Sequence, residues 1–140
     1  MRYLIDTNIF VYMATDAGLL SRDVAAILQE PETVLCMSAE SARELVIGFR
    51  GRKLYSKHWK TAQQMLAAIE KEFYIQILPL KKEHMLTYAS LMTDDAHGHN
   101  DPSDHIIISH AITERLPLIS SDRRFEFYRK QGLDFVFNKK

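Results

Sequence analysis

Five short apolar segments constrain the fold of this chain more than any other feature of its sequence. They lie at residues 3–5, 33–37, 74–78, 118–120 and 135–137, and most positions within them are apolar. A short and nearly continuous apolar run is typical of a strand that is covered on both faces of a sheet. We therefore expect these segments to form the central sheet of the protein.

Between these segments, apolar residues recur at helical spacing. In the clearest case Ala39, Ala42, Val46 and Phe49 lie three or four residues apart and follow Ser38, a residue type that favours helix N-caps. Other helical patterns follow Ser21, cover residues 59–73 and 85–92, begin at Asp101 and run from Asp122 to Gly132. Strands that alternate with helices imply parallel crossovers. We therefore predict an α/β fold of three layers, α/β/α, around a short-stranded central parallel sheet.

The length and composition exclude several classes of protein. A chain of 140 residues is expected to form one domain, residues 1–140. Eighteen Lys and Arg residues balance eighteen Asp and Glu residues, so binding to nucleic acid needs local clusters of charge. The single cysteine excludes an internal disulfide and a Cys-rich zinc site. No apolar stretch suits a membrane span or a signal peptide, so we expect a cytoplasmic protein without a membrane partner.

Four acidic residues fall where an α/β fold places its functional site. Asp6 directly follows the first apolar segment, Asp122 follows the fourth, and Asp104 lies in the first turn of a predicted helix. Glu44 flanks the apolar stripe of the helix that follows Ser38. Sites in parallel sheets form at the carboxyl ends of the strands. Four converging carboxylates repel one another unless a cation offsets their charge, and Mg²⁺ or Mn²⁺ prefers such oxygen ligands.

The segments that carry these acids resemble a known family. YLIDTNIF at 3–10, SARELVIG at 41–48, NDPSDHIIISHA at 100–111 and LISSDRRF at 118–125 are similar, in order and spacing, to the four acidic motifs of PIN-domain ribonucleases. They most resemble the VapC-type toxins of bacterial toxin–antitoxin systems. The resemblance spans essentially the whole chain. It implies a PIN-like fold and a metal-dependent endoribonuclease that cleaves RNA phosphodiester bonds with Mg²⁺ or Mn²⁺.

The resemblance also implies roles for individual residues. The catalytic and metal-binding set would be Asp6, Glu44, Asp104 and Asp122. Asp6 and Asp104 would be the principal ligands, whereas the other two would bind a second metal or hold its waters, and the number of metals stays open. The small polar positions that support this set would be Thr7, Asn8 and Ser120, with the two hydroxyls orienting carboxylates.

Two of these acidic positions have rivals nearby. Asp101 and Asp104 both occur in the DPSDH segment, and either could be the site residue. Asp101 precedes Pro102 and suits a helix N-cap, which favours Asp104 for the site. Glu40 lies one helical turn before Glu44 and is its rival.

Basic residues suggest where RNA would bind. Arg50, Arg52 and Lys53 begin a basic run with interleaved aromatic residues, which either grips an RNA backbone or is simply a solvated face. Arg123 and Arg124 are next to Asp122 and would lie closer to the scissile phosphate. The loop histidines His97 and His99 are weak evidence for a metal site, because no further ligands follow at suitable spacing.

The resemblance further implies partners, and it leaves alternatives open. A toxin needs a cognate antitoxin, which would lay an apolar segment along the helix pair at about 38–73 and insert an Arg or Lys among the acids. A homodimer is also implied. The alternatives are a non-catalytic PIN-like module that binds RNA or protein, and a housekeeping PIN nuclease without an antitoxin. A haloacid-dehalogenase-like phosphatase is disfavoured, because Asn8 stands where its second Asp belongs.

Overall fold

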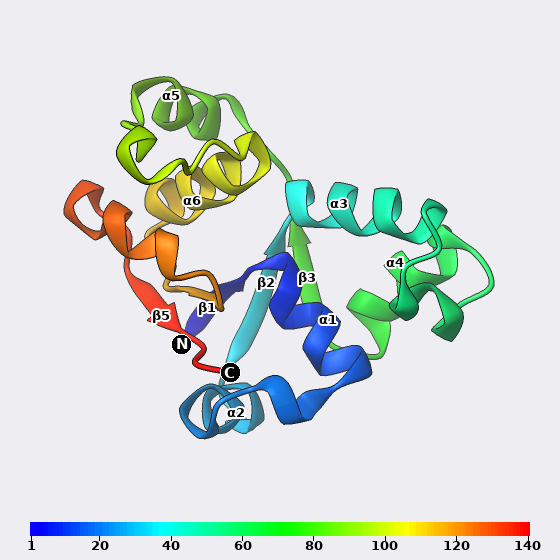
Figure 1. The fold of residues 1–140 in the computed structure, drawn as a ribbon. Coiled ribbons are helices and arrows are strands. Elements are labelled where there is room, and N and C mark those ends of the chain that lie inside the picture. The colour runs from blue at the N-terminus through cyan, green and yellow to red at the C-terminus, as the bar shows by residue number, and fades with distance from the viewer.

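The computed structural model describes all 140 residues and contains one five-stranded parallel sheet (Figure 1). The strands are β1 (Arg2–Ile5), β2 (Val34–Ser38), β3 (Ile75–Leu78), β4 (Leu118–Ser120) and β5 (Phe135–Phe137). Their order in the sheet is β3-β2-β1-β4-β5, and every neighbouring pair is parallel. All five predicted strands are therefore confirmed.

Six α-helices connect and cover the strands. They are α1 (Thr7–Thr15), α2 (Arg22–Gln29), α3 (Ala39–Arg50), α4 (Ala62–Lys71), α5 (Lys82–Ser90) and α6 (Pro102–Glu114). Short 3-10 helices occupy Ala17–Leu19, Leu54–His58, Asp95–His97 and Arg123–Gln131. The last of these replaces the α-helix expected after Asp122, although Gly132 ends it in the left-handed conformation with φ of 104°.

The helices differ from the sequence-based expectation in two further ways. The helix expected over 59–73 begins only at Ala62, because the side chain of Thr61 accepts the N–H of Gln64 and caps it there. Trp59 therefore precedes the helix and stacks on Phe10, with ring centroids 6.2 Å apart. Helix α1 was not anticipated, because its residues 9–11 are continuously apolar and give no helical stripe.

Apolar side chains on both faces of the sheet create the three layers. Neighbouring residues of β1 point to opposite sides, so that Ile5 joins a core with α1, α3 and α4, whereas Leu4 joins a core with α6. Figure 1 shows α5 and α6 on one side of the sheet and α1 and α4 on the other. The expected α/β/α architecture is confirmed. No helix combines the length and hydropathy that a membrane span requires.

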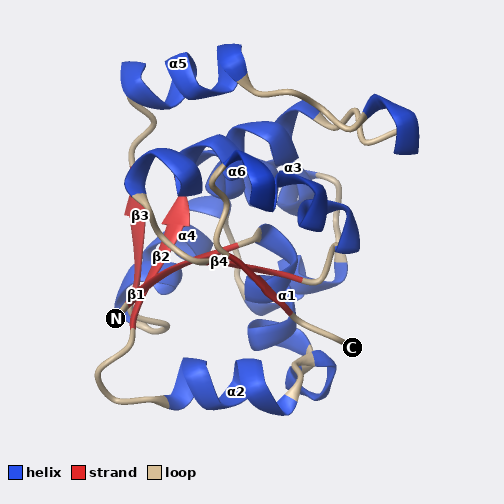
Figure 2. Cartoon of the chain, turned by 90° about the vertical axis from the view of Figure 1, so that its left-hand side faces the viewer, coloured by secondary structure: helices blue, strands red, loops and turns tan.

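The carboxyl ends of the strands carry the starts of the covering helices. In Figures 1 and 2, α2 lies near the amino ends of the strands, whereas α3 begins where β2 ends. Asp6 caps α1 directly after β1, and Asp122 caps the 3-10 helix after β4. The side chain of Asp101 accepts the N–H groups of Ser103 and Asp104, which confirms Asp101 as the N-cap of α6.

Candidate functional site

The four predicted acids line one cavity at the carboxyl edge of the sheet. Its volume is about 290 Å³, and its lining consists of Asp6, Thr7, Asn8, Val11, Tyr12, Glu44, Asp104 and Asp122. The acids come from the end of β1, from α3, from the first turn of α6 and from the turn after β4. Segments that are far apart in the sequence thus bring four carboxylates together.

Asp6 is the most buried of these acids, with 4% of its surface exposed. One carboxylate oxygen accepts the Ser120 hydroxyl at 2.6 Å, and the other accepts the backbone N–H of Thr7 at 2.8 Å. Burial, together with the charges of Asp104 and Glu44, raises the pKa of Asp6 to about 7. Ser120 therefore orients this carboxylate, as expected for a supporting hydroxyl.

Asp104 and Glu44 complete the buried part of the cavity. Burial and the charges of Asp101, Asp122 and Glu44 raise the pKa of Asp104 to about 7. The Thr7 hydroxyl donates to Glu44 Oε1 at 2.6 Å, and burial raises the pKa of Glu44 despite that hydrogen bond. Thr7 thus orients Glu44 as Ser120 orients Asp6. Asn8 lines the cavity, but its Oδ1 atom is buried without a partner.

The rival carboxylate Glu40 is paired with an arginine and lies outside the cavity. Arg43 donates to both of its oxygens, with a shortest distance of 2.5 Å. Burial alone would raise the pKa of Glu40, but the hydrogen bonds and charge of Arg43 outweigh it and lower that pKa. Glu40 does not line the cavity, so Glu44 is the acid that α3 contributes to it.

This donor set fits a hard divalent cation. The cavity presents four carboxylates, and two of them have strongly raised pKa values because burial and mutual repulsion disfavour their charged forms. No cationic side chain forms an ion pair with Asp6 or Glu44. A cation such as Mg²⁺ or Mn²⁺ would offset the repulsion, and its preferred ligands are oxygens of this kind.

Arg124 lies beside this cavity, next to Asp122 as expected, but the sequence did not predict its ion pair with that acid. Its guanidinium donates to both oxygens of Asp122, at distances from 2.8 to 3.2 Å, and lies 4.0 Å from Asp104 Oδ2. Burial tends to raise the pKa of Asp122, but the hydrogen bonds and charge of Arg124 lower it overall. Asp122 is thus the acid of the cavity that Arg124 pairs with most closely, and Asp104 makes a longer contact with the same guanidinium.

A second, basic cavity adjoins the acidic one. It has a volume of about 560 Å³ and shares Asn8 and Asp122 with the first. Its remaining lining consists of Ser121, Arg123, Arg124, Phe137, Asn138, Lys139 and Lys140. The guanidinium of Arg123 lies 4.9 Å from the centre of the Phe137 ring. Of the basic residues singled out in the sequence, Arg123 and Arg124 therefore lie beside the acids.

The other predicted basic residues lie elsewhere. Arg50, Arg52 and Lys53 line neither the acidic nor the basic cavity. Among the aromatic residues interleaved with them, Tyr55 is buried and donates its hydroxyl to the carbonyl of Leu45 at 2.9 Å. Its ring is unavailable for stacking on RNA bases, so this part of the RNA-grip interpretation is wrong.

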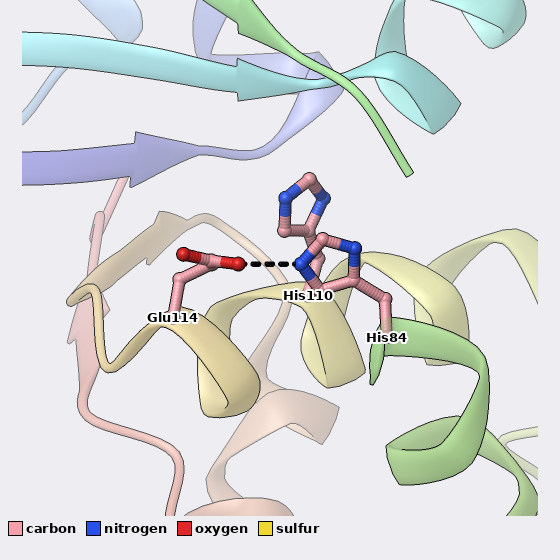
Figure 3. Close-up of side chains that lie close together, drawn as sticks. All are labelled: His84, His110 and Glu114. Atoms are coloured by element: carbon pink, nitrogen blue, oxygen red, sulfur yellow. Dashed lines mark hydrogen bonds and ion pairs between the residues drawn. The ribbon is translucent and has the colours of Figure 1, made fainter. Parts of the chain in front are cut away.

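A separate cluster of His84, His110 and Glu114 joins α5 to α6 (Figure 3). His84 Nδ1 accepts the N–H of Lys81 at 2.8 Å, so its proton is on Nε2, which donates to Glu114 at 2.7 Å. The two imidazole rings are in contact but tilted by 37°, with centroids 4.0 Å apart. Two imidazoles on one tetrahedral metal would place their centroids about 5 Å apart. The cluster is therefore a hydrogen-bonded packing contact and fits a metal poorly.

Comparisons with known proteins agree with this architecture. The VapBC2 structure from Rickettsia felis, bound to a promoter DNA fragment, matches with a TM-score of 0.74 and 20% identity over 99% of this chain and 100% of that chain. VapBC-1 from nontypeable Haemophilus influenzae matches with a TM-score of 0.68 and 24% identity over 100% of both chains. FitAcB from Neisseria gonorrhoeae matches with a TM-score of 0.66 and 21% identity over 99% of this chain and 97% of that chain. At these identities the likeness shows a shared fold.

The family match is a separate finding. A comparison with curated proteins finds no significant match. The sequence profile described as PIN domain, however, matches residues 3–131. This range covers strands β1 to β4, apart from Arg2, and all four acids of the cavity, whereas β5 lies beyond it. The chain belongs to the PIN domain family.

Proposed function

We propose that residues 1–140 form a single PIN-like nuclease domain that cleaves RNA phosphodiester bonds with Mg²⁺ or Mn²⁺. The proposal is carried by one observation: four carboxylates line one cavity, and burial with mutual repulsion raises the pKa of two of them to about 7. Such an arrangement is costly without a cation, and clustered, perturbed carboxylates are typical of functional sites. We further propose that the protein is a VapC-type toxin of a type II toxin–antitoxin system.

In this proposal the acids divide into two pairs. Asp6 and Asp104 are the principal metal ligands, whereas Glu44 and Asp122 hold a second cation or its waters. A bound divalent cation supplies positive charge against a phosphodiester and lowers the pKa of water. The protein's own contribution is orientation. Ser120 holds Asp6, Thr7 holds Glu44, and both hydrogen bonds are 2.6 Å long.

The basic cavity suits the RNA backbone on one side of the cut. Arg123, Lys139 and Lys140 form no ion pair with a carboxylate, so their charges remain available to phosphates. Arg124 pairs with Asp122 in this structure, and it would be available to a phosphate if Asp122 held a cation instead. The choice of RNA over DNA rests on the resemblance to PIN-domain ribonucleases.

A cognate antitoxin is the proposed regulator. The structural relatives include a toxin–antitoxin complex from Klebsiella pneumoniae, with a TM-score of 0.62 and 19% identity over 96% of this chain and 95% of that chain. On this chain the helix pair at about 38–73 exposes Ile47 and Leu54, which are 53% and 76% accessible. We propose that an apolar antitoxin segment covers them and inserts a basic side chain among the acids. A homodimer is also part of the proposal.

The test is cleavage of mixed RNA and mixed DNA by the purified protein, with Mg²⁺, with Mn²⁺ and with chelator. We expect metal-dependent cleavage of RNA by the wild-type protein and none by Asp6→Asn. Intact RNA under every condition would refute the nuclease and favour a binding module, and cleavage of DNA alone would refute the substrate. For the toxin, expression should arrest growth, and co-expression of the neighbouring small open reading frame should restore it. Harmless expression of an active nuclease would indicate a housekeeping enzyme.

A further inference from the structure

A buried histidine, His99, contacts one of the acids that line the acidic cavity. His99 has no exposed surface, and its Nε2 atom lies 3.1 Å from Asp104 Oδ2. Its Nδ1 atom lies 2.9 Å from the hydroxyl of Tyr128, which is also fully buried. The Tyr128 oxygen in turn accepts the backbone N–H of Asp94 at 3.2 Å. These contacts form a continuous chain from the Asp94 backbone to the Asp104 carboxylate.

We infer that His99 is a positioning residue, which donates a hydrogen bond from Nε2 to Asp104 and does not itself bind the metal. This inference rests on the proposed function, because it assumes that Asp104 is a metal ligand. The alternative is plausible from distances alone: one potential ligand atom each from His99, Asp104 and Asp122 lie within 4.8 Å of one another.

The placement of protons decides between the two roles. The Tyr128 oxygen already accepts from Asp94, and the only acceptor recorded for its own proton is His99 Nδ1. When Tyr128 donates to Nδ1, the neutral imidazole carries its single proton on Nε2, which then donates to Asp104. If Nε2 instead offered its lone pair to a metal, Nδ1–H would donate to Tyr128, whose proton would be buried without a partner. An unsatisfied buried donor is costly, so the donor role is favoured.

The consequence is a carboxylate held in a fixed orientation. The hydrogen bond from His99 engages one lone pair of Asp104 Oδ2 and leaves Oδ1 free to bind a cation. A second contact fixes the histidine itself, because His105 Nε2 lies 3.0 Å from the His99 carbonyl oxygen and donates to it. Loss of a hydrogen bond that orients a metal ligand typically weakens metal affinity roughly 10- to 100-fold.

The experiment measures Mn²⁺ affinity by electron paramagnetic resonance, which needs no turnover. We expect His99→Leu to weaken binding by roughly 10- to 100-fold, and His99→Gln to recover much of the loss, because its amide N–H can replace the donor. Pulsed spectra of the wild-type protein should show no ¹⁴N coupling from a directly bound imidazole. Such a coupling, lost in His99→Gln, would overturn the inference by making His99 a ligand. The matched control is His58→Leu, an exposed histidine outside both cavities.

A second variant covers the case in which His99→Leu fails to fold. Tyr128→Phe keeps the ring but removes the hydroxyl that holds His99 Nδ1, so His99 should be oriented less firmly and Mn²⁺ affinity should fall in the same direction. Unchanged affinity in a folded Tyr128→Phe protein would refute the role of Tyr128 in holding His99. If the wild-type protein binds no Mn²⁺ at all, the proposed function fails. If it binds Mn²⁺ and both His99 variants match it, only the positioning role fails.

Discussion

The hydroxyl of Ser120 donates to the carboxylate of Asp6 at 2.6 Å, although 114 residues separate them in the chain. Ser120 is the last residue of β4, and Asp6 directly follows β1, its parallel neighbour in the sheet. Parallel strands end at the same edge, so residues that follow them meet there. The same hydroxyl oxygen accepts the N–H of Asp122 at 3.1 Å, which connects two of the four acids through one side chain.

Asp6→Asn should abolish RNA cleavage and also stabilise the metal-free protein at pH 7. The pKa of Asp6 is raised to about 7 in the folded state, so the unfolded carboxyl ionises first as pH rises from about 4. Folding is therefore penalised progressively up to pH 7, by as much as about 4 kcal/mol. Asparagine carries no charge and removes this penalty. Urea unfolding without metal at pH 7 and pH 4 should show a gain in stability only at pH 7.

The matched control is Asp101→Asn. Asn also caps helices well, and Asp101 holds two N–H groups at the start of α6 without lining the acidic cavity. This variant should keep most of the cleavage activity and gain less stability at pH 7 than Asp6→Asn, because the charge of Asp101 only adds to burial in raising the pKa of Asp104. If Asp101→Asn were inactive while Asp104→Asn remained active, the assignment of the two acids would be reversed.

Divalent metal should stabilise the wild-type protein against heat at pH 7. A ligand that binds only the folded state adds about 2.7 kcal/mol when its concentration is 100 times its dissociation constant. Melting curves with millimolar Mn²⁺ and with chelator should differ by several degrees, as expected for about 1–3 kcal/mol in a domain of this size. The double variant Asp6→Asn, Asp104→Asn should show no such shift. An identical wild-type melting temperature in both conditions would contradict a well-formed metal site.

Sequence reasoning succeeded where the signal was local. The five strands are short apolar runs, and the acids that follow β1 and β4 could be located once those strands were recognised. The cap at Asp101 was also predictable, because Asp before Pro at a helix start is a local pattern. The supporting role of Ser120 came from the resemblance to PIN-domain ribonucleases, and its hydrogen bond to Asp6 agrees with that role.

The features that were missed depend on side chains brought together by the fold. The orientation of His99 depends on its contact with Tyr128, which is 29 residues away. Nothing in the local HGHN segment indicates that contact. Arg124 was expected near a phosphate, but its pairing with Asp122 follows from a side-chain conformation that no pattern encodes. Helix α1 was missed because a continuously apolar segment suits a buried strand as well as a helix.

His110 should make the protein less stable in acid. Burial, and then the charge of His84, lowers the pKa of His110 to about 4, although Glu114 opposes that shift. The unfolded chain therefore takes up a proton near pH 6.5 that the folded protein resists until about pH 4, so stability falls as the pH drops through this range. The expected loss is about 3 kcal/mol. Asp6 and Asp104 change stability in the opposite direction, so the effect must be isolated by a variant.

The comparison is urea unfolding of the wild-type protein and His110→Asn at pH 7 and at pH 4.5. Asparagine does not titrate and can keep a hydrogen bond to Ser38, whose hydroxyl lies 2.9 Å from His110 Nδ1. The difference in stability between the two proteins should therefore shrink or reverse at pH 4.5. A difference that is constant across this range would show that His110 titrates normally.

The basic cavity should contribute to binding of long RNA rather than to the cleavage step. Lys139→Ala with Lys140→Ala removes two charges from its lining but none from the acidic cavity, so KM for a long RNA should rise while kcat stays within about twofold. The dependence of affinity on salt should also become shallower, because fewer counterions are released on binding. The matched control is Lys57→Ala with Lys60→Ala, two exposed lysines of the run near α4 that line neither cavity. If the control pair raised KM and the cavity pair did not, RNA would lie along α3 and α4, and the proposed path beside Arg123 would be wrong.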